Sequence, residues 1–246
     1  MRKLVILFLT IVIVSCSMPK TSDRSDSIII QDSVMVDSAI LDNLFILDSV
    51  STKEKFFKNL SYSHNFKLTF FEHYKDGEAE THYWEILIYD KKMNLVDSIL
   101  QPVYAFYSEW VDFTEPDSYR SYITGINKNK QAIDNYYGLF IVADFNFDAK
   151  NDFAIINDMG GNGGTFNSYY IQHNDNKFVL DTFLTDSMMY FPSKIDVTNR
   201  QLTTYVHAGV CWMGEHVYEL DKNNKWKEIS HKTIDVLTGE ITHEKK

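Results

Sequence analysis

The stretch IVADFNFDAKNDFAIIND, residues 141–158, decides how this sequence is interpreted. A short polar segment lies there between two apolar runs, residues 140–143 and 153–156. Short apolar runs on either side of a segment rich in Asp and Asn are typical of two strands joined by a loop. Oxygen-bearing side chains occupy positions 1, 3, 5 and 9 of that loop, namely Asp144, Asn146, Asp148 and Asp152.

Oxygen ligands at this spacing predict a calcium site, because Ca²⁺ takes about six to eight oxygens at about 2.3–2.6 Å. The backbone carbonyl of Lys150, at position 7, is the expected further ligand. Position 12 is Ile155 rather than a bidentate Glu, so we expect a strand–loop–strand site closed by Asp152. Position 6 is Ala149, where such loops favour glycine, and this indicates modest affinity. The alternative is a polar hairpin loop held by side-chain-to-backbone hydrogen bonds.

The N-terminus has the pattern of an exported lipoprotein. Arg2 and Lys3 precede an apolar run over residues 4–14 that is too short to span a bilayer as a mature helix. The run ends in IVSC, which resembles the bacterial lipobox, so we predict a signal peptide over residues 1–15 and lipidation, palmitate included, at Cys16. Several acyl chains would anchor the chain firmly, since each buried CH₂ contributes about 0.8 kcal/mol. The alternative is an ordinary secretory signal with an incidental cysteine.

The rest of the chain is predicted to be a tether and one domain. Residues 16–55 contain the lipidated cysteine and a tether or packed arm rich in Ser, Thr and Asp. Residues 56–246 are predicted to form a single all-β domain, with the calcium loop at 144–152. A brief helical turn is expected over residues 53–59.

Charge and cysteine content exclude some classes of function. The chain has 34 acidic and 24 basic residues, a formal net charge of −10, and no marked basic run. Nucleic-acid binding is therefore disfavoured. With Cys16 acylated, Cys211 has no cysteine partner, so we expect no disulfide and expect Cys211 to pack as a small apolar residue.

From residue 61 onward the pattern is one of short strands separated by turns. The Asp-Gly pair at residues 76–77 predicts a hairpin, and later turns fall at residues 174–176, 199–200 and 222–224. Few segments keep a helical period, and 17 Phe, 15 Tyr and 4 Trp favour packed sheets. We therefore predict an all-β, antiparallel, propeller-like meander, with a strand over residues 178–184 among its members.

Residues 138–153, GLFIVADFNFDAKNDF, resemble the FG-GAP calcium unit of integrin-type β-propellers. The glycine-rich GGNGGT at 160–165, TTY at 203–205 and the Gly209-x-x-Trp212-x-Gly214 pattern follow it. This order is similar to a family of bacterial periplasmic lipoproteins with one FG-GAP-like loop, and the similarity covers about residues 137–227. It implies a propeller-like all-β fold, bound Ca²⁺ and a protein partner. Members of that family inhibit peptidoglycan-cleaving enzymes, as immunity proteins or relatives of lysozyme inhibitors.

Two loops near the calcium segment, residues 160–167 and 208–215, are the candidate partner-binding loops. Glycines allow close approach of a partner's backbone, and aromatic side chains are enriched at binding hot spots. The glycine-rich loop lacks the lysine and the following helix of a phosphate-binding loop. A zinc site at the second loop is disfavoured, because no CxxC pair accompanies its one cysteine. The candidate residues are Gly161, Asn162, Gly163, Tyr169, His207, Trp212 and Met213.

No catalytic constellation can be assembled from the sequence, so we expect a binding protein rather than an enzyme. The leading hypothesis is a lipid-anchored periplasmic or outer-membrane protein that binds calcium and inhibits a peptidoglycan hydrolase. The alternative is a carbohydrate-binding or adhesive surface lipoprotein, and a structural role in an envelope complex is a third reading.

Overall fold

The computed structural model describes residues 49–104, 108–133, 135–160 and 164–245. The predicted signal peptide, the lipidation at Cys16, most of the tether and the candidate contacts Gly161, Asn162 and Gly163 lie outside the described residues. No helix in the described part of the chain has both the length and the apolar character needed to cross a membrane.

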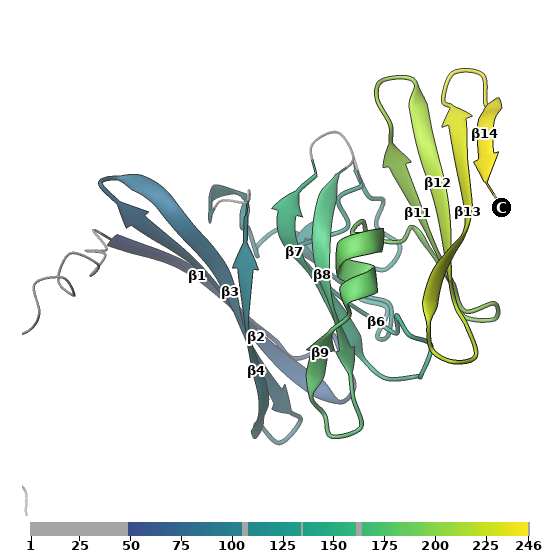
Figure 1. Cartoon of the computed structure of the whole chain (residues 1–246). Coiled ribbons are helices and arrows are strands. Elements are labelled where there is room, and N and C mark those ends of the chain that lie inside the picture. The colour runs from purple at the N-terminus through teal and green to yellow at the C-terminus, as the bar shows by residue number, and fades with distance from the viewer. Residues whose placement is uncertain (1–48, 105–107, 134, 161–163, 246) are drawn as a thin grey trace, which may run out of the picture. The chain divides into compact units, whose positions relative to one another are not determined.

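Three sheets follow one another along the chain, and the strands of each sheet are neighbours in sequence order (Figure 1). The first sheet contains β1 (Ser49–Phe57), β2 (His64–Lys75), β3 (Glu78–Asp90) and β4 (Leu95–Val103). The second contains β5 (Tyr119–Ser121), β6 (Phe140–Ala143), β7 (Asp152–Met159), β8 (Thr165–Gln172) and β9 (Phe178–Leu180). The third contains β10 (Lys194–Asp196), β11 (Gln201–His207), β12 (Trp212–Leu220), β13 (Trp226–Asp235) and β14 (Ile241–Lys245).

The predicted all-β meander is confirmed. Every neighbouring pair of strands is antiparallel except β5 and β6, which are parallel. The Asp-Gly hairpin forms as the sequence predicts, because Asp76 and Gly77 have φ angles of 53° and 80° between the paired Lys75 and Glu78. Positive φ at both central residues is the requirement of the type I′ turn. Short helical segments lie between strands, namely η1 (Ser108–Trp110), η2 (Pro116–Ser118) and η4 (Leu184–Met188).

The second sheet is buried on both of its faces. Phe140 and Val142 of β6 belong to the hydrophobic core shared with the first sheet. The alternate residues of the same strand, Ile141 and Ala143, belong to a second core shared with η4 and the third sheet. A strand covered on both faces needs apolar side chains at every position, which explains the unbroken run FIVA. The predicted calcium segment is therefore attached to two largely buried strands.

The first core consists mainly of aromatic and branched side chains from the first two sheets. The Trp84 indole of β3 is fully buried there and donates to the Ile156 carbonyl of β7 at 2.9 Å. Phe153 of β7 packs against Phe66, Phe140, Tyr170 and Phe178. The high aromatic content read from the sequence thus serves contact between sheets.

Two local expectations are wrong. The helical turn expected over residues 53–59 is absent, because Lys53 to Phe57 extend β1 along the whole edge of β2, and Phe57 enters the first core. The strand expected over residues 178–184 ends at Leu180, and Leu184 begins η4 instead. Leu184 is fully buried in the second core. Its burial stabilises the helical turn more than continued pairing of this segment with β8 would.

Candidate calcium site and partner-binding loops

The predicted calcium loop connects β6 and β7. Ala143 pairs with Asp152 at the base of the hairpin, so the two buried strands fix both ends of residues 144–151. Phe147 and Ala149 have positive φ angles of 61° and 65°, which turn the chain sharply within eight residues. The conformation inferred for position 6 is therefore present, with alanine in a backbone region that favours glycine.

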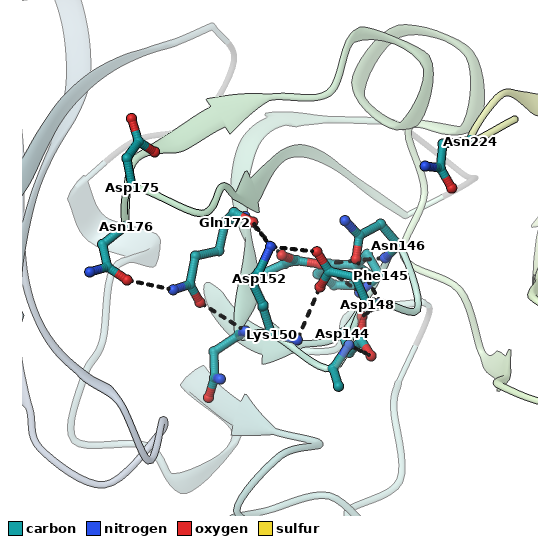
Figure 2. Close-up of polar contacts among 12 residues, drawn as sticks. Asp144, Phe145, Asn146, Asp148, Lys150, Asp152, Gln172, Asp175, Asn176 and Asn224 are labelled. Atoms are coloured by element: carbon teal, nitrogen blue, oxygen red, sulfur yellow. Dashed lines mark hydrogen bonds and ion pairs between the residues drawn. The ribbon is translucent and has the colours of Figure 1, made fainter.

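The side chains of the loop point inward and accept hydrogen bonds from its own backbone. Asp144 accepts from Asp148 N at 3.0 Å and from Ala149 N at 2.9 Å, through different carboxylate oxygens. Asn146 Oδ1 accepts from Asp148 N at 3.2 Å, and Asp148 Oδ1 accepts from Lys150 N at 3.0 Å. Figure 2 shows Asp144, Asn146 and Asp148 gathered on one side of Asp152. The four predicted side-chain ligands thus lie together.

Asp152 is the buried member of this group. Its carboxylate is fully buried; Oδ1 accepts from Gln172 N at 2.9 Å, and Oδ2 accepts from Phe145 N at 2.8 Å and from Asn146 N at 3.4 Å. Burial raises the pKa of Asp152 to about 7, even though the Gln172 and Phe145 N–H groups act in the opposite direction. The nearby charges of Asp144 and Asp148 add to the rise. Burial likewise raises the pKa of Asp144.

The arrangement fits a bound Ca²⁺. A carboxylate oxygen that accepts a single N–H, such as Asp152 Oδ1, keeps a second lone pair and can still bind a cation. Burial makes the Asp144 and Asp152 carboxylates unfavourable when ionised, and a divalent cation would remove that cost. One feature works against tight binding, because the Lys150 ammonium lies 2.9 Å from Asp148 Oδ2 and competes for that oxygen. The alternative, a polar hairpin loop, explains the same backbone bonds, including those that Asp152 accepts.

Two residues that the sequence did not single out, Gln172 and Arg200, support this loop. Gln172 of β8 accepts from Asn151 N at 3.1 Å and donates to Asn176 Oδ1 at 3.1 Å (Figure 2). Arg200 donates to the Asn146 carbonyl at 3.5 Å and to Asn224 Oδ1 at 2.9 Å. These contacts depend on strand register and on packing between sheets, so no local sequence signal identifies them.

A cavity of about 340 Å³ lies beside the loop. The loop contributes Asn146 and Asp148 to its lining, and the third sheet contributes Arg200, Leu220 and Trp226. Phe147 of the loop also contacts Trp226, with ring centroids 6.0 Å apart. The loop therefore joins the second sheet to one end of the third sheet.

The glycine-rich loop connects β7 and β8. Gly160 N donates to the Gly164 carbonyl at 2.6 Å. A Cβ at residue 160 would lie 2.4 Å from that carbonyl oxygen and 2.7 Å from the Phe166 ring, so only glycine fits there. Gly164 has a φ of 101°, which also favours glycine. Glycines at the base of this loop are thus explained by local packing.

The second candidate loop is the β11–β12 hairpin connection. His207 pairs with Met213, and Ala208 N donates to the Trp212 carbonyl at 2.8 Å. His207, Trp212 and Met213 are all half-buried, and Val210 at the tip is 92% exposed. The Cys211 carbonyl accepts from Val236 N at 2.9 Å, so the β13–β14 turn lies beside this tip.

Tyr169 does not face a partner. Its ring is fully buried in the second core, and its hydroxyl donates to the Tyr190 carbonyl at 2.7 Å. Tyr169 is among the partner-binding candidates predicted from the sequence, but both faces of this sheet are covered. We leave Tyr169 out of the proposed partner surface.

The predicted calcium loop lies near one end of β11, and the β11–β12 hairpin connection lies at the other end. Arg200, which contacts the calcium loop, directly precedes β11, and His207 ends it. Seven strand residues at about 3.3 Å each separate the two features by about 20 Å. A cation in the loop can therefore shape the junction between two sheets without touching a partner at the tip.

Comparison with known proteins shows the fold and nothing more specific. No protein-family model matches the chain, and no curated protein matches it. One solved structure, described as a Xanthomonas type IV secretion system related protein, is similar over 81% of this chain and 95% of its own, with 16% identity and a TM-score of 0.50. No family match thus supports the resemblance to FG-GAP units or to inhibitors of peptidoglycan-cleaving enzymes. The solved protein shares the overall arrangement of strands.

Proposed function

We propose that this chain is a lipid-anchored, calcium-binding envelope protein that binds and inhibits a peptidoglycan-cleaving enzyme. The proposal joins the lipobox-like IVSC at residues 13–16, the carboxylate loop at 144–152 and an exposed binding surface on the third sheet. In this scheme the loop holds Ca²⁺ through Asp144, Asn146, Asp148, Asp152 and the Lys150 carbonyl. The cation steadies the scaffold, and the partner is bound elsewhere.

The observation that carries the proposal is an apolar tip on the third sheet, formed by Val210, Trp212, Val236 and Leu237. Val210 is 92% exposed and Leu237 is 80% exposed, although they belong to adjacent turns of one sheet. Trp212 pairs with Asp235 at the base of those turns. Apolar side chains gathered at an exposed tip mark an interaction site, and aromatic residues anchor such sites.

The structural neighbour favours a setting at the cell envelope. That protein is described as related to a type IV secretion system, and the two chains share a fold. A protein of this fold at the envelope would meet enzymes that cleave the cell wall. Insertion of the apolar tip into a substrate cleft, with backbone and aromatic contacts in place of the glycan, would block such an enzyme.

The test mixes the full chain with peptidoglycan hydrolases encoded beside its gene. We expect a stable complex and loss of lytic activity with one of them. The double substitution Val210→Asp and Leu237→Asp should abolish both effects, because it places charges at the buried centre of the interface. The matched control is Leu100→Asp, at a side chain on β4 that is 65% exposed and outside the tip.

Several outcomes would reject the proposal. Absence of complex and of inhibition with every neighbouring hydrolase would reject the inhibitor function. Binding to a glycan array, abolished by the same double substitution, would instead support the alternative of a carbohydrate-binding or adhesive lipoprotein. Equal loss of inhibition in the Leu100→Asp control would show that the apolar tip is not the binding site.

A further inference from the structure

Three side chains with metal-binding atoms meet on the third sheet, away from the calcium loop. His216 lies on β12, and Glu228 and His231 lie on the neighbouring β13. One ligand atom from each residue falls within 4.8 Å of the others. Nothing in the proposed inhibitory function uses these residues.

A β-bulge brings the three side chains to one face. His216 pairs directly with His231, and Glu228 pairs with Tyr218, so each pair shares a face. Glu228 and His231 are three residues apart, which in a regular strand places them on opposite faces. The register shift between Val217 and Tyr218 leaves Ile229 as the extra residue and restores the common face. Bulges often re-aim a side chain at a functional site.

The contacts at this cluster are close. His216 Nδ1 lies 2.7 Å from Glu228 Oε1. The rings of His216 and His231 are stacked, with centroids 4.1 Å apart and planes 18° apart. Gly214 makes room for this arrangement, because a Cβ there would lie 2.8 Å from His216 Nε2. The His216 ring is thus held by its neighbours from two strands.

The donor set selects the class of ion. Two imidazoles and one carboxylate suit first-row transition metals such as Zn²⁺, whereas Ca²⁺ prefers oxygen alone. Zn–N and Zn–O bonds are about 2.0–2.2 Å, so two ligand atoms of one ion lie about 3 Å apart, close to the His216–Glu228 separation.

The cluster is accessible to an ion and lies at the margin of the second core. The His216 side chain is 23% exposed and that of Glu228 is 37% exposed, so water can complete the coordination. Tyr218, on the same face, is buried in the second core and stacks on His216 at 6.3 Å. We propose that His216, Glu228 and His231 bind one Zn²⁺ ion and thereby tie β12 to β13.

The experiment titrates Zn²⁺ into the full, untagged chain by calorimetry, with Ca²⁺ in excess to occupy carboxylate sites. We expect one equivalent of Zn²⁺ to bind, and at least tenfold weaker binding after His231→Ala or His216→Gln. Glu228→Gln should weaken binding less, because the amide oxygen remains a donor. The matched control, His173→Ala, changes an exposed histidine outside the cluster and should bind as the unchanged chain does.

A second probe tests ligand identity. Cu²⁺ bound at the site should give an electron paramagnetic resonance spectrum with coupling to two nitrogens, reduced to one in either His variant. Circular dichroism identifies a variant that fails to fold. If one His variant fails to fold, the result of the other His variant decides whether the cluster binds the metal. No Zn²⁺ binding, or binding that both His variants leave unchanged, would overturn the inference and reduce the cluster to a hydrogen-bonded cross-strand pair.

Discussion

Ala149 occupies a backbone conformation that costs an alanine energy. At its φ of 65° the Cβ crowds the backbone, and a left-handed residue costs about 1–2 kcal/mol unless it is glycine. Ala149→Gly should therefore stabilise the protein by about 0.5–1 kcal/mol, after the greater entropy of glycine in the unfolded chain is subtracted. We expect a melting temperature about 2–3 °C higher, together with tighter Ca²⁺ binding in a competition assay.

The control for this change is Ala208→Gly. Ala208 is exposed and does not have a positive φ, so glycine there adds only unfolded-state entropy. It should be neutral or destabilising. A rise in melting temperature for both variants, or for neither, would contradict the explanation from backbone conformation.

Asp152 should make stability depend on pH, and bound calcium should reduce that dependence. Its pKa rises from 3.8 to about 7 on folding, mainly through burial. A raised folded pKa favours the protonated form, so this stabilisation is complete below pH 4 and is lost as pH rises through 7. In EDTA, chemical denaturation should show stability falling between about pH 4 and pH 7, by on the order of 4 kcal/mol at most.

Calcium should offset part of this loss, because the cation binds the ionised carboxylates and is displaced by protons at lower pH. At about 1 mM Ca²⁺ and a dissociation constant of about 10⁻⁴ M, the gain near pH 8 is about 1.4 kcal/mol. Asp152→Asn is the matched control, since it keeps the shape without the titration. An unchanged pH profile in that variant would assign the effect to other groups.

At the residue scale, the sequence indicated which side chains gather in the loop but not the residues that support them. Four oxygen side chains with fixed spacing in one loop are visible in any single sequence. Gln172 and Arg200, by contrast, reach the loop from residues 20 or more positions away, through register and packing that no local pattern encodes. The buried position of Tyr169 follows from the third sheet covering its strand, which is equally non-local.

Among the elements, the hairpins were predictable because the residue types of their turns are a local sequence signal. Asp-Gly at residues 76–77 and Asn-Arg at 199–200 each fall between paired strands. Strand ends were less predictable, since a buried side chain such as Leu184 can favour a helical turn over continued pairing. The bulge beside Tyr218 has no sequence signal, although it decides which face Glu228 occupies.

Arg200 connects three turns, and its loss should loosen one end of the third sheet. Its guanidinium donates to the carbonyls of Asp221 and Asn146 and to Asn224 Oδ1, in the β12–β13 turn and the calcium loop. Arg200→Ala should destabilise the protein by about 1–2 kcal/mol, because partly buried acceptors lose their donors. Hydrogen exchange should rise in residues 220–226 but not in β1–β4.

Arg200→Lys is the informative companion variant. Alanine, lysine and arginine share the cost of the φ of 53° at this position, so backbone strain cancels in the comparison. A lysine ammonium cannot match the planar, forked guanidinium, and should recover only part of the lost stability. Full recovery by lysine would mean that charge alone is sufficient at this junction.

At the scale of the whole molecule, the second sheet contributes to both hydrophobic cores. The apolar runs of β6 and β7 predicted buried strands, and their covering on both faces is the physical reason for the absence of alternation. Which sheets cover β6 and β7 could not be predicted from the sequence, because contacts between sheets join residues far apart in the chain. The link from Trp84 on β3 to Ile156 on β7 is one such contact.

This arrangement predicts that the described sheets unfold together. Phe153 packs in the first core, while its neighbour Ala154 packs in the second, so loss of β7 removes one wall from each. Phe153→Ala should cost about 3–5 kcal/mol and lower the melting temperature by roughly 10 °C. Leu100→Ala, at an exposed site on β4, should change stability by less than about 0.5 kcal/mol.

The shape of the transition tests the coupling separately from its midpoint. Near-ultraviolet circular dichroism reports all aromatic residues, and hydrogen exchange resolves the first sheet from the third. If the second sheet couples both cores, Phe153→Ala shifts one common transition for every probe, and Ca²⁺ shifts that same transition back. Separate midpoints for β1–β4 and β10–β14 would mean that each core is stable without the other, and that calcium acts only on the junction it touches.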